Sequence, residues 1–170
     1  MDISTDIIKQ LREQCGAGIM DCRNALLKTE GDMEKALEIL KEEGLIRAQK
    51  KTDRVAEQGL VEAYVHPGGR IGAMVEINCE TDFVARTEDF KELAHHLAMQ
   101  VAAMSPQLIS EEEAVPGSND LDPAAACLLL QPYIKDTSLT VQDVITETIA
   151  KVGENIKVSR FARFKLGEKE

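Results

Sequence analysis

The sequence predicts an α+β fold in which an N-terminal bundle of three short helices precedes a core of helices packed on a small three-stranded antiparallel sheet. In the first 45 residues, apolar side chains recur at three- and four-residue spacing, which is the helical period. The period then changes to the alternation typical of strands. Because the strands come early and late in this second part, with helices between them, we expect the helices to cover one sheet face. The expected strands are 59–65, 70–78 and 156–166.

Glycines separate the three N-terminal helices. The first is expected from about Ser4 to Gln14, where Ser4 or Thr5 supplies the capping hydroxyl. Gly16 and Gly18 break the chain before a second helix over 19–28. Asp32 is a good N-cap for the third helix, which we expect to end with Gly44 at its C′ position.

A polar, basic connector over residues 45–54 follows, and we expect it to be mostly helical. The turn residues His66-Pro67-Gly68-Gly69 then join the first two strands into a hairpin.

Cap residues mark three further helices in the second part of the chain. Thr87 begins a long helix that Pro106 ends, and Asp122-Pro123 begins another that runs to about residue 131. Thr140 caps the last helix, and Gly153 closes it. Residues 105–122 form an acidic loop, with Pro116-Gly117 as a turn, for which the sequence offers no function.

These elements divide the chain into two expected domains. Residues 1–54 contain the three-helix bundle and the connector, and residues 55–170 contain the α+β core. A three-stranded sheet covered on one face leaves its other face open. An open apolar sheet face is usually covered, and a second copy of the chain is one candidate for its cover.

Composition and charge narrow the function. The 170 residues include no Trp, two Tyr and four Phe, so the core is expected to be aliphatic. The net charge of −10 disfavours nucleic acid as the main partner, since phosphate binding requires a basic surface. A local basic cluster of Arg47, Lys50, Lys51 and Arg54 fits a solvated helix end or a protein contact better than an RNA site. The start of the chain lacks a signal peptide pattern and no apolar run is long enough to span a bilayer, so we expect a cytoplasmic protein without a membrane partner.

Enzyme signals are weak, and we expect no catalytic residue, no cofactor and no bound metal. No phosphate-binding glycine motif follows a strand. His95 and His96 are interpreted as helix-surface residues rather than zinc ligands. Cys15, Cys22, Cys79 and Cys127 lack metal-site spacing and are expected to be free, mostly packed thiols. A Cys–His nucleophilic pair has no support beyond the presence of both residue types.

The segment 78–86, between a strand and a helix cap, combines a large aromatic with a neighbouring carboxylate. On the pattern alone, two readings remain open. Phe83 folds back into the core while Asp82 caps the next turn, or Phe83 enters an apolar pocket of a partner while Asp82 acts on charge near it.

Four segments resemble the elongation factor Ts family, and together they span nearly the whole chain in the order that family shows. The glycine turn of the first and the Thr-Asp-Phe-Val motif of the third are highly specific together. The segments are Leu11 to Cys22 with Ala25-Leu26 and Gly31-Asp32, then Ala48-Gln49-Lys50-Lys51 through Gly59, then Asn78 to Ala85, and finally Gln131-Pro132-Tyr133 with Gly153 to Ile156 and Arg160-Phe161.

The resemblance implies a ubiquitin-associated-like (UBA-like) N-terminal bundle and a short form with a single core unit that dimerises through its sheet. It also implies a translation elongation factor that acts as guanine nucleotide exchange factor for elongation factor Tu, in its GDP-bound and nucleotide-free states. Partner contact, with displacement of the partner's Mg²⁺, is implied for Thr81, Asp82, Phe83 and Val84, and contact by the N-terminal domain for Arg12, Ile19, Met20 and Arg23.

Departures from the family pattern are modest. Cys15 stands where Thr is usual, Ile19 where Met is common, and Ser159 where a basic residue is frequent. Three other functions compete with nucleotide exchange: a module that recruits peptides or ubiquitin-like partners, an enzyme, and an RNA-binding accessory protein. The intact Thr81–Val84 motif argues against the first, the lack of a convergent polar pocket against the second, and the acidic net charge against the third.

Overall fold

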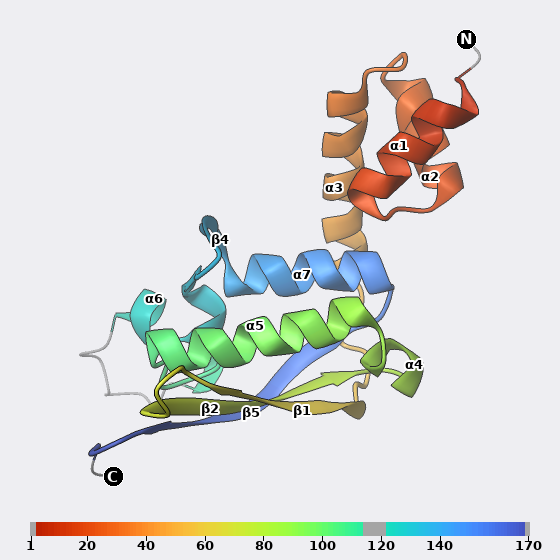
Figure 1. The fold of residues 1–170 in the computed structure, drawn as a ribbon. Coiled ribbons are helices and arrows are strands. Elements are labelled where there is room, and N and C mark those ends of the chain that lie inside the picture. The colour runs from red at the N-terminus through yellow and green to blue at the C-terminus, as the bar shows by residue number, and fades with distance from the viewer. Residues whose placement is uncertain (1–2, 114–121, 169–170) are drawn as a thin grey trace.

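A computed structural model describes residues 3–113 and 122–168 and confirms the α+β fold class (Figure 1). The expected turn at Pro116-Gly117 lies outside the described residues. The elements in chain order are α1 (Thr5–Cys15), α2 (Ile19–Lys28), α3 (Met33–Gln49), β1 (Gln58–Val65), β2 (Ile71–Cys79), α4 (Asp82–Ala85), α5 (Glu88–Met104), the 3₁₀ turn η1 (Glu111–Glu113), α6 (Pro123–Ala126), the 3₁₀ turn η2 (Leu128–Leu130), β3 (Pro132–Tyr133), β4 (Asp136–Thr140), α7 (Val141–Val152) and β5 (Ile156–Lys165).

The main sheet has the strand order β1-β2-β5, and both pairings are antiparallel. All three strands agree with the sequence prediction to within one residue at each end. Gly59 is required where β1 begins, because its φ is +146° and an added Cβ would lie 2.1 Å from the carbonyl oxygen of Ile77. The close approach of β1 to β2 at this point therefore excludes any side chain.

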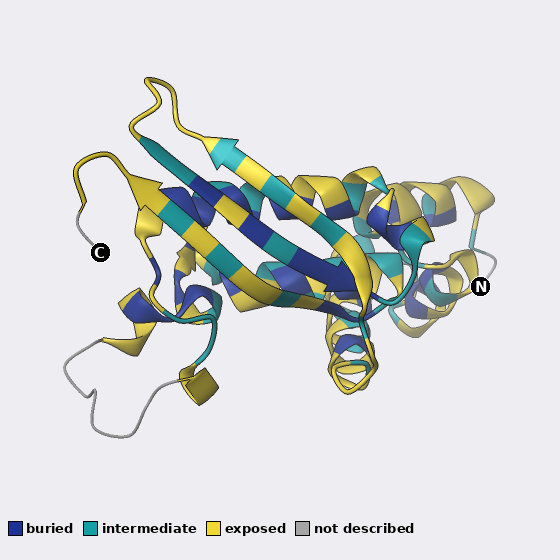
Figure 2. Cartoon of the chain, turned by 90° about the horizontal axis from the view of Figure 1, so that it is seen from below, coloured by how far each residue is buried: buried dark blue, intermediate teal, exposed yellow. Residues whose placement is uncertain are grey.

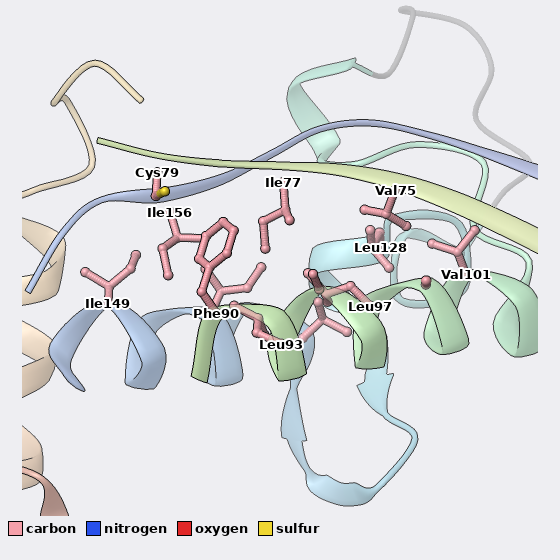
Figure 3. Packing of buried hydrophobic residues seen from close by; sticks show 14 of the residues in the cluster. Val75, Ile77, Cys79, Phe90, Leu93, Leu97, Val101, Leu128, Ile149 and Ile156 are labelled. Atoms are coloured by element: carbon pink, nitrogen blue, oxygen red, sulfur yellow. The ribbon is translucent and has the colours of Figure 1, made fainter. Parts of the chain in front are cut away.

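Helices α5 and α7 cover one face of this sheet, and the aliphatic core lies between the two layers (Figure 3). Phe90 of α5 is fully buried there and belongs to the same core cluster as Leu97, Val75 and Ile77. Local capping sets the helix starts as predicted. Thr87 accepts a hydrogen bond from the Phe90 amide, and Thr140 forms a capping box with Asp143.

The N-terminal helices bury a second, separate cluster of apolar side chains around Leu11, Cys22, Leu26 and Leu40. The prediction that helix three ends at Gly44 is wrong, because α3 continues through Gly44 to Gln49. An added Cβ at Gly44 would lie 3.2 Å from the Cβ of Ala150, so the glycine lets α3 pass close to α7. The N-terminal bundle is seated on the core by this contact.

The region between α5 and α7 differs most from the prediction. Asp122 caps α6 and Pro123 is its first residue, as expected, but α6 has four residues instead of continuing to residue 131. The chain then forms η2 and a small β3–β4 hairpin. Gln131 is fully buried here, where its side chain donates to the carbonyl of Ala125 and accepts from Gln100. Satisfying this buried amide favours irregular backbone over helix.

The second face of the main sheet carries no covering element among the described residues (Figure 2). Val61, Val65, Met74 and Phe164 are exposed on it. Among the described helices, none combines the length and the apolar character that a bilayer span requires.

Candidate functional site

Helix α4 is a single helical turn between β2 and α5, in the segment that the sequence marked as a candidate binding loop. Thr81 is its N-cap, and the Thr81 hydroxyl accepts a hydrogen bond from the Val84 amide at 3.4 Å. Asp82 lies in the first turn, where a carboxylate is stabilised by the helix N-terminus. Thr81 and Asp82 thus stabilise the start of this helical turn locally.

Phe83 points away from the protein with 78% of its surface exposed. The alternative in which Phe83 folds back into the core and Asp82 caps the next turn is therefore wrong, and Thr87 is the cap of α5. Val84 is only 8% exposed and belongs to the core cluster together with Ala85. This turn is consequently anchored by Val84 and Ala85, while it presents Phe83 to solvent.

Asp82 forms an ion pair with Arg86, in which Asp82 Oδ2 lies 2.7 Å from Arg86 Nη2. The Arg86 side chain is largely open to solvent and the Asp82 side chain is about half exposed, and solvent-accessible pairs of this kind contribute about 0–1 kcal/mol. Asp82 can therefore exchange Arg86 for another polar partner at little cost in free energy.

Thr81 is held from a distant part of the chain by Glu154, which follows α7. Glu154 Oε2 accepts from the Thr81 amide at 2.9 Å, and Glu154 Oε1 accepts from the Thr81 hydroxyl at 2.6 Å. The Cys79 thiol donates to the Thr81 carbonyl, and burial raises the pKa of that thiol. Sequence reasoning missed Glu154 as a site residue, although the residue stands within one of the segments that carry the family resemblance.

The N-terminal candidates form a second exposed set. Ile19 and Met20 begin α2 and are 55% and 61% exposed, so both face outward. Arg23 lies one turn later on the same helix and Arg12 lies on α1, and neither has an ion-pair partner within the described residues. The bundle that carries this set and helix α4 lie toward the same end of the core (Figure 1).

The histidines and cysteines form no metal centre, because residues 3–113 and 122–168 contain no cluster of three or more His, Cys, Asp or Glu side chains able to hold an ion. His95 Nδ1 lies 2.9 Å from Glu62, and His96 bonds to Tyr133 and Lys135. Burial and the charge of Lys135 lower the pKa of His96.

All four cysteines are free thiols, as predicted, and three of them are buried. The Sγ atoms of Cys15 and Cys22 lie 3.9 Å apart, and burial raises the pKa of Cys22 to about 11. A thiol with so high a pKa is a poor nucleophile at neutral pH.

Comparison with known proteins identifies the family of this chain. The family model described as Elongation factor TS matches residues 6–119. Elongation factor Ts of Carboxydothermus hydrogenoformans is 47% identical, and the match covers 98% of this chain and 90% of that protein. Elongation factor Ts of Thermotoga neapolitana is 47% identical, with 99% of each chain covered. Elongation factor Ts of Coprothermobacter proteolyticus is 46% identical, and the match covers 99% of this chain and all of that protein. The chain therefore belongs to the elongation factor Ts family of translation elongation factors.

Proposed function

We propose that this chain is a guanine nucleotide exchange factor for elongation factor Tu, and that Phe83 at the tip of α4 opens the partner's nucleotide site. The observation that supports the proposal is a large aromatic side chain, 78% exposed, on a turn fixed at both ends by Thr81 and Val84. The few residues that contribute most of the binding energy of a protein interface are often aromatic side chains of this kind.

Asp82 supplies the second part of the mechanism. Its present partner Arg86 is exposed, so the carboxylate is available to accept or repel polar groups of the GTPase. We infer that Phe83 enters between helices of the GTPase while Asp82 disturbs the water shell of the Mg²⁺ ion bound there. Mg²⁺ requires near-ideal octahedral geometry, so a small displacement of its surroundings lowers its affinity. GDP then loses the cation that neutralises its phosphates.

Exchange of this kind is coupled binding and needs no catalytic residue. The factor binds the nucleotide-free GTPase most tightly, and by reciprocity each nucleotide weakens binding of the factor. GTP then fills the empty site and releases the factor. On this proposal the chain is not an enzyme, binds no cofactor or metal of its own, and acts in the cytoplasm without contacting nucleic acid or membrane.

The N-terminal bundle is proposed to hold the nucleotide-binding domain of the GTPase. Ile19 and Met20 supply exposed apolar area, and Arg12 and Arg23 supply charge around it. In this division of roles, residues 1–54 form a UBA-like domain that grips the partner. Residues 55–170 form the core domain that carries Phe83 and the sheet.

The open face of the sheet is proposed to pair with a second copy of the chain. Two cross-strand rows lie side by side on this face: Val65-Gly72-Phe164 and Ala63-Met74-Ala162. Together they form an apolar patch bordered by the Glu76–Arg160 ion pair. Sedimentation at micromolar concentration should give the mass of two chains, and the variant Phe164→Asp should sediment as one.

The exchange function is tested by the release of a fluorescent GDP analogue from elongation factor Tu. Release is compared without factor, with the intact chain, and with a variant carrying Asp82→Ala and Phe83→Ala. We expect strong acceleration by the intact chain and little by the double variant, whose far-UV circular dichroism should be unchanged. No acceleration by the intact chain would refute the exchange function.

A further inference from the structure

The three residues Gly153, Glu154 and Asn155, which we call the junction segment, follow α7 and contact two distant parts of the chain, residues 51–54 and residues 80–81. Gly153 ends the helix in a left-handed conformation, with φ of +82°, which turns the next two residues toward β2 and the connector. Each of the three residues then makes a different long-range hydrogen bond. The segment therefore couples elements that lie far apart in the sequence.

The first contact fixes α4. The two carboxylate oxygens of Glu154 accept from the amide and the hydroxyl of Thr81, at 2.9 and 2.6 Å. Hydrogen bonds to a charged acceptor are about twice as strong as neutral ones. Because the Thr81 hydroxyl also accepts from the Val84 amide, Glu154 orients the cap that begins α4. The direction in which Phe83 points depends on that cap.

The second contact fixes the connector below the N-terminal bundle. The Asn155 side-chain amide donates to the carbonyls of Thr52 and Arg54, at 3.1 and 2.7 Å. Lys51 Nζ donates to the Gly153 carbonyl at 2.7 Å. Asn155 is almost fully buried, so these bonds are shielded from water. The segment 51–54 leads directly out of α3, and its position sets where the bundle stands.

The third contact ties these two together. The backbone amide of Asn155 donates to Glu80 Oε1 at 2.7 Å, and Arg54 Nη1 lies 3.7 Å from the same oxygen. Glu80 immediately precedes Thr81. The connector, the junction segment and the start of α4 thus share one continuous set of polar contacts.

From this geometry we propose that Glu154 is a positioning residue for nucleotide exchange, which holds Phe83 in a fixed direction relative to the N-terminal bundle. The proposal rests on the exchange function proposed above. Two contact surfaces on one rigid frame bind a partner simultaneously, whereas the same surfaces on a loose frame lose the advantage of effective concentration. Glu154 itself is half-buried and does not need to touch the partner.

The first test needs no partner. The variant Glu154→Gln keeps the size of the side chain but removes the charge and one of its two acceptor oxygens. Hydrogen exchange of the full chain, followed by NMR, should show protection of the Thr81 amide falling about tenfold, since a lost charge-assisted bond is of that order. Protection of the Val84 amide, which donates to the Thr81 hydroxyl, should fall with it. Protection of the Phe90 amide should not change. Unchanged protection at Thr81 would overturn the proposal whether or not the chain acts on a GTPase.

The second test measures exchange in two backgrounds. Glu154→Gln should lower the maximal rate of stimulated GDP release about fivefold to tenfold in the intact chain and should have no further effect when Phe83→Ala is already present. A residue that acts only through stability would lower the rate equally in both backgrounds, and that result would overturn the proposal. Glu92→Gln, an exposed glutamate on α5 outside the junction segment, is the matched control and should leave both rates unchanged. If the intact chain fails to stimulate release, the exchange function is wrong, and the hydrogen-exchange result alone still decides whether Glu154 positions α4.

Discussion

Replacing Phe83 with alanine removes the proposed wedge and leaves the fold intact. Fully burying a phenylalanine side chain contributes about 1.5–3 kcal/mol. Because 78% of Phe83 is exposed in the free chain, burial against a partner accounts for about 1.2–2.3 kcal/mol of that amount. The second-order rate constant for stimulated GDP release should therefore fall about 8- to 50-fold. The free energy of unfolding should change by less than about 0.5 kcal/mol, since few contacts of the folded chain are lost.

Stopped-flow release of a fluorescent GDP analogue over a range of factor concentrations measures this rate constant, and urea unfolding measures the stability. Met104→Ala is the control, because Met104 is also an exposed apolar residue, at the far end of α5 from α4. A loss of less than threefold for Phe83→Ala would refute the wedge. An equal loss for Met104→Ala would show that general surface changes, and not the wedge, control release.

Three further predictions concern stability and reactivity. The pKa of His96 is lowered in the fold by burial and by Lys135, so the unfolded chain binds the proton more tightly and stability should fall as pH drops below about 6.5. Urea unfolding midpoints measured between pH 7.5 and 5 should fall less in His96→Gln than in the intact chain. The same pH dependence in both proteins would contradict a role of His96. Gly59→Ala should destabilise the chain by at least ~3 kcal/mol because the new Cβ meets the Ile77 carbonyl, whereas Gly72→Ala, with its nearest neighbours at 3.5 Å, should cost less than about 1 kcal/mol in the same unfolding assay. Iodoacetamide at pH 8 should label Cys15 first, since the other three thiols are buried and burial raises their pKa values. Peptide mass spectrometry of the native chain measures the order of labelling, and early labelling of Cys22 would contradict the prediction.

The elements that the sequence predicts well are those whose signals are local. Thr87, Thr140 and Gly153 stand at helix ends because of hydrogen bonds within a few residues, and the structure places all three there. Gly44 shows the limit of this reasoning. A glycine after an apolar helical stripe is typical of a helix end, but here its missing side chain admits a second helix, and only the tertiary contact with Ala150 distinguishes the two cases.

The candidate site divides in the same way. Asp82 and Phe83 can be selected from the sequence because a carboxylate and an aromatic stand together between two regular elements, although the pattern leaves the direction of Phe83 undecided. Thr81 and Asp82 also form an N-cap signal that predicts the helical turn α4. The signal is overlooked when the segment is interpreted as a loop. Glu154 is separated from Thr81 by 73 residues, and no spacing rule connects them.

The helical state of α4 in the free chain has a kinetic consequence. Ordering the backbone costs about 1–2 kcal/mol per residue, and for the four residues of α4 that cost falls on folding and not on association. Encounter with a partner then requires no rearrangement of this turn, so the association rate is set by diffusion and orientation, in the range of about 10⁵–10⁷ M⁻¹s⁻¹ for docking of preformed surfaces. On the proposed exchange function, the chain meets its partner once in each round of nucleotide turnover, and it gains speed because this ordering is complete beforehand.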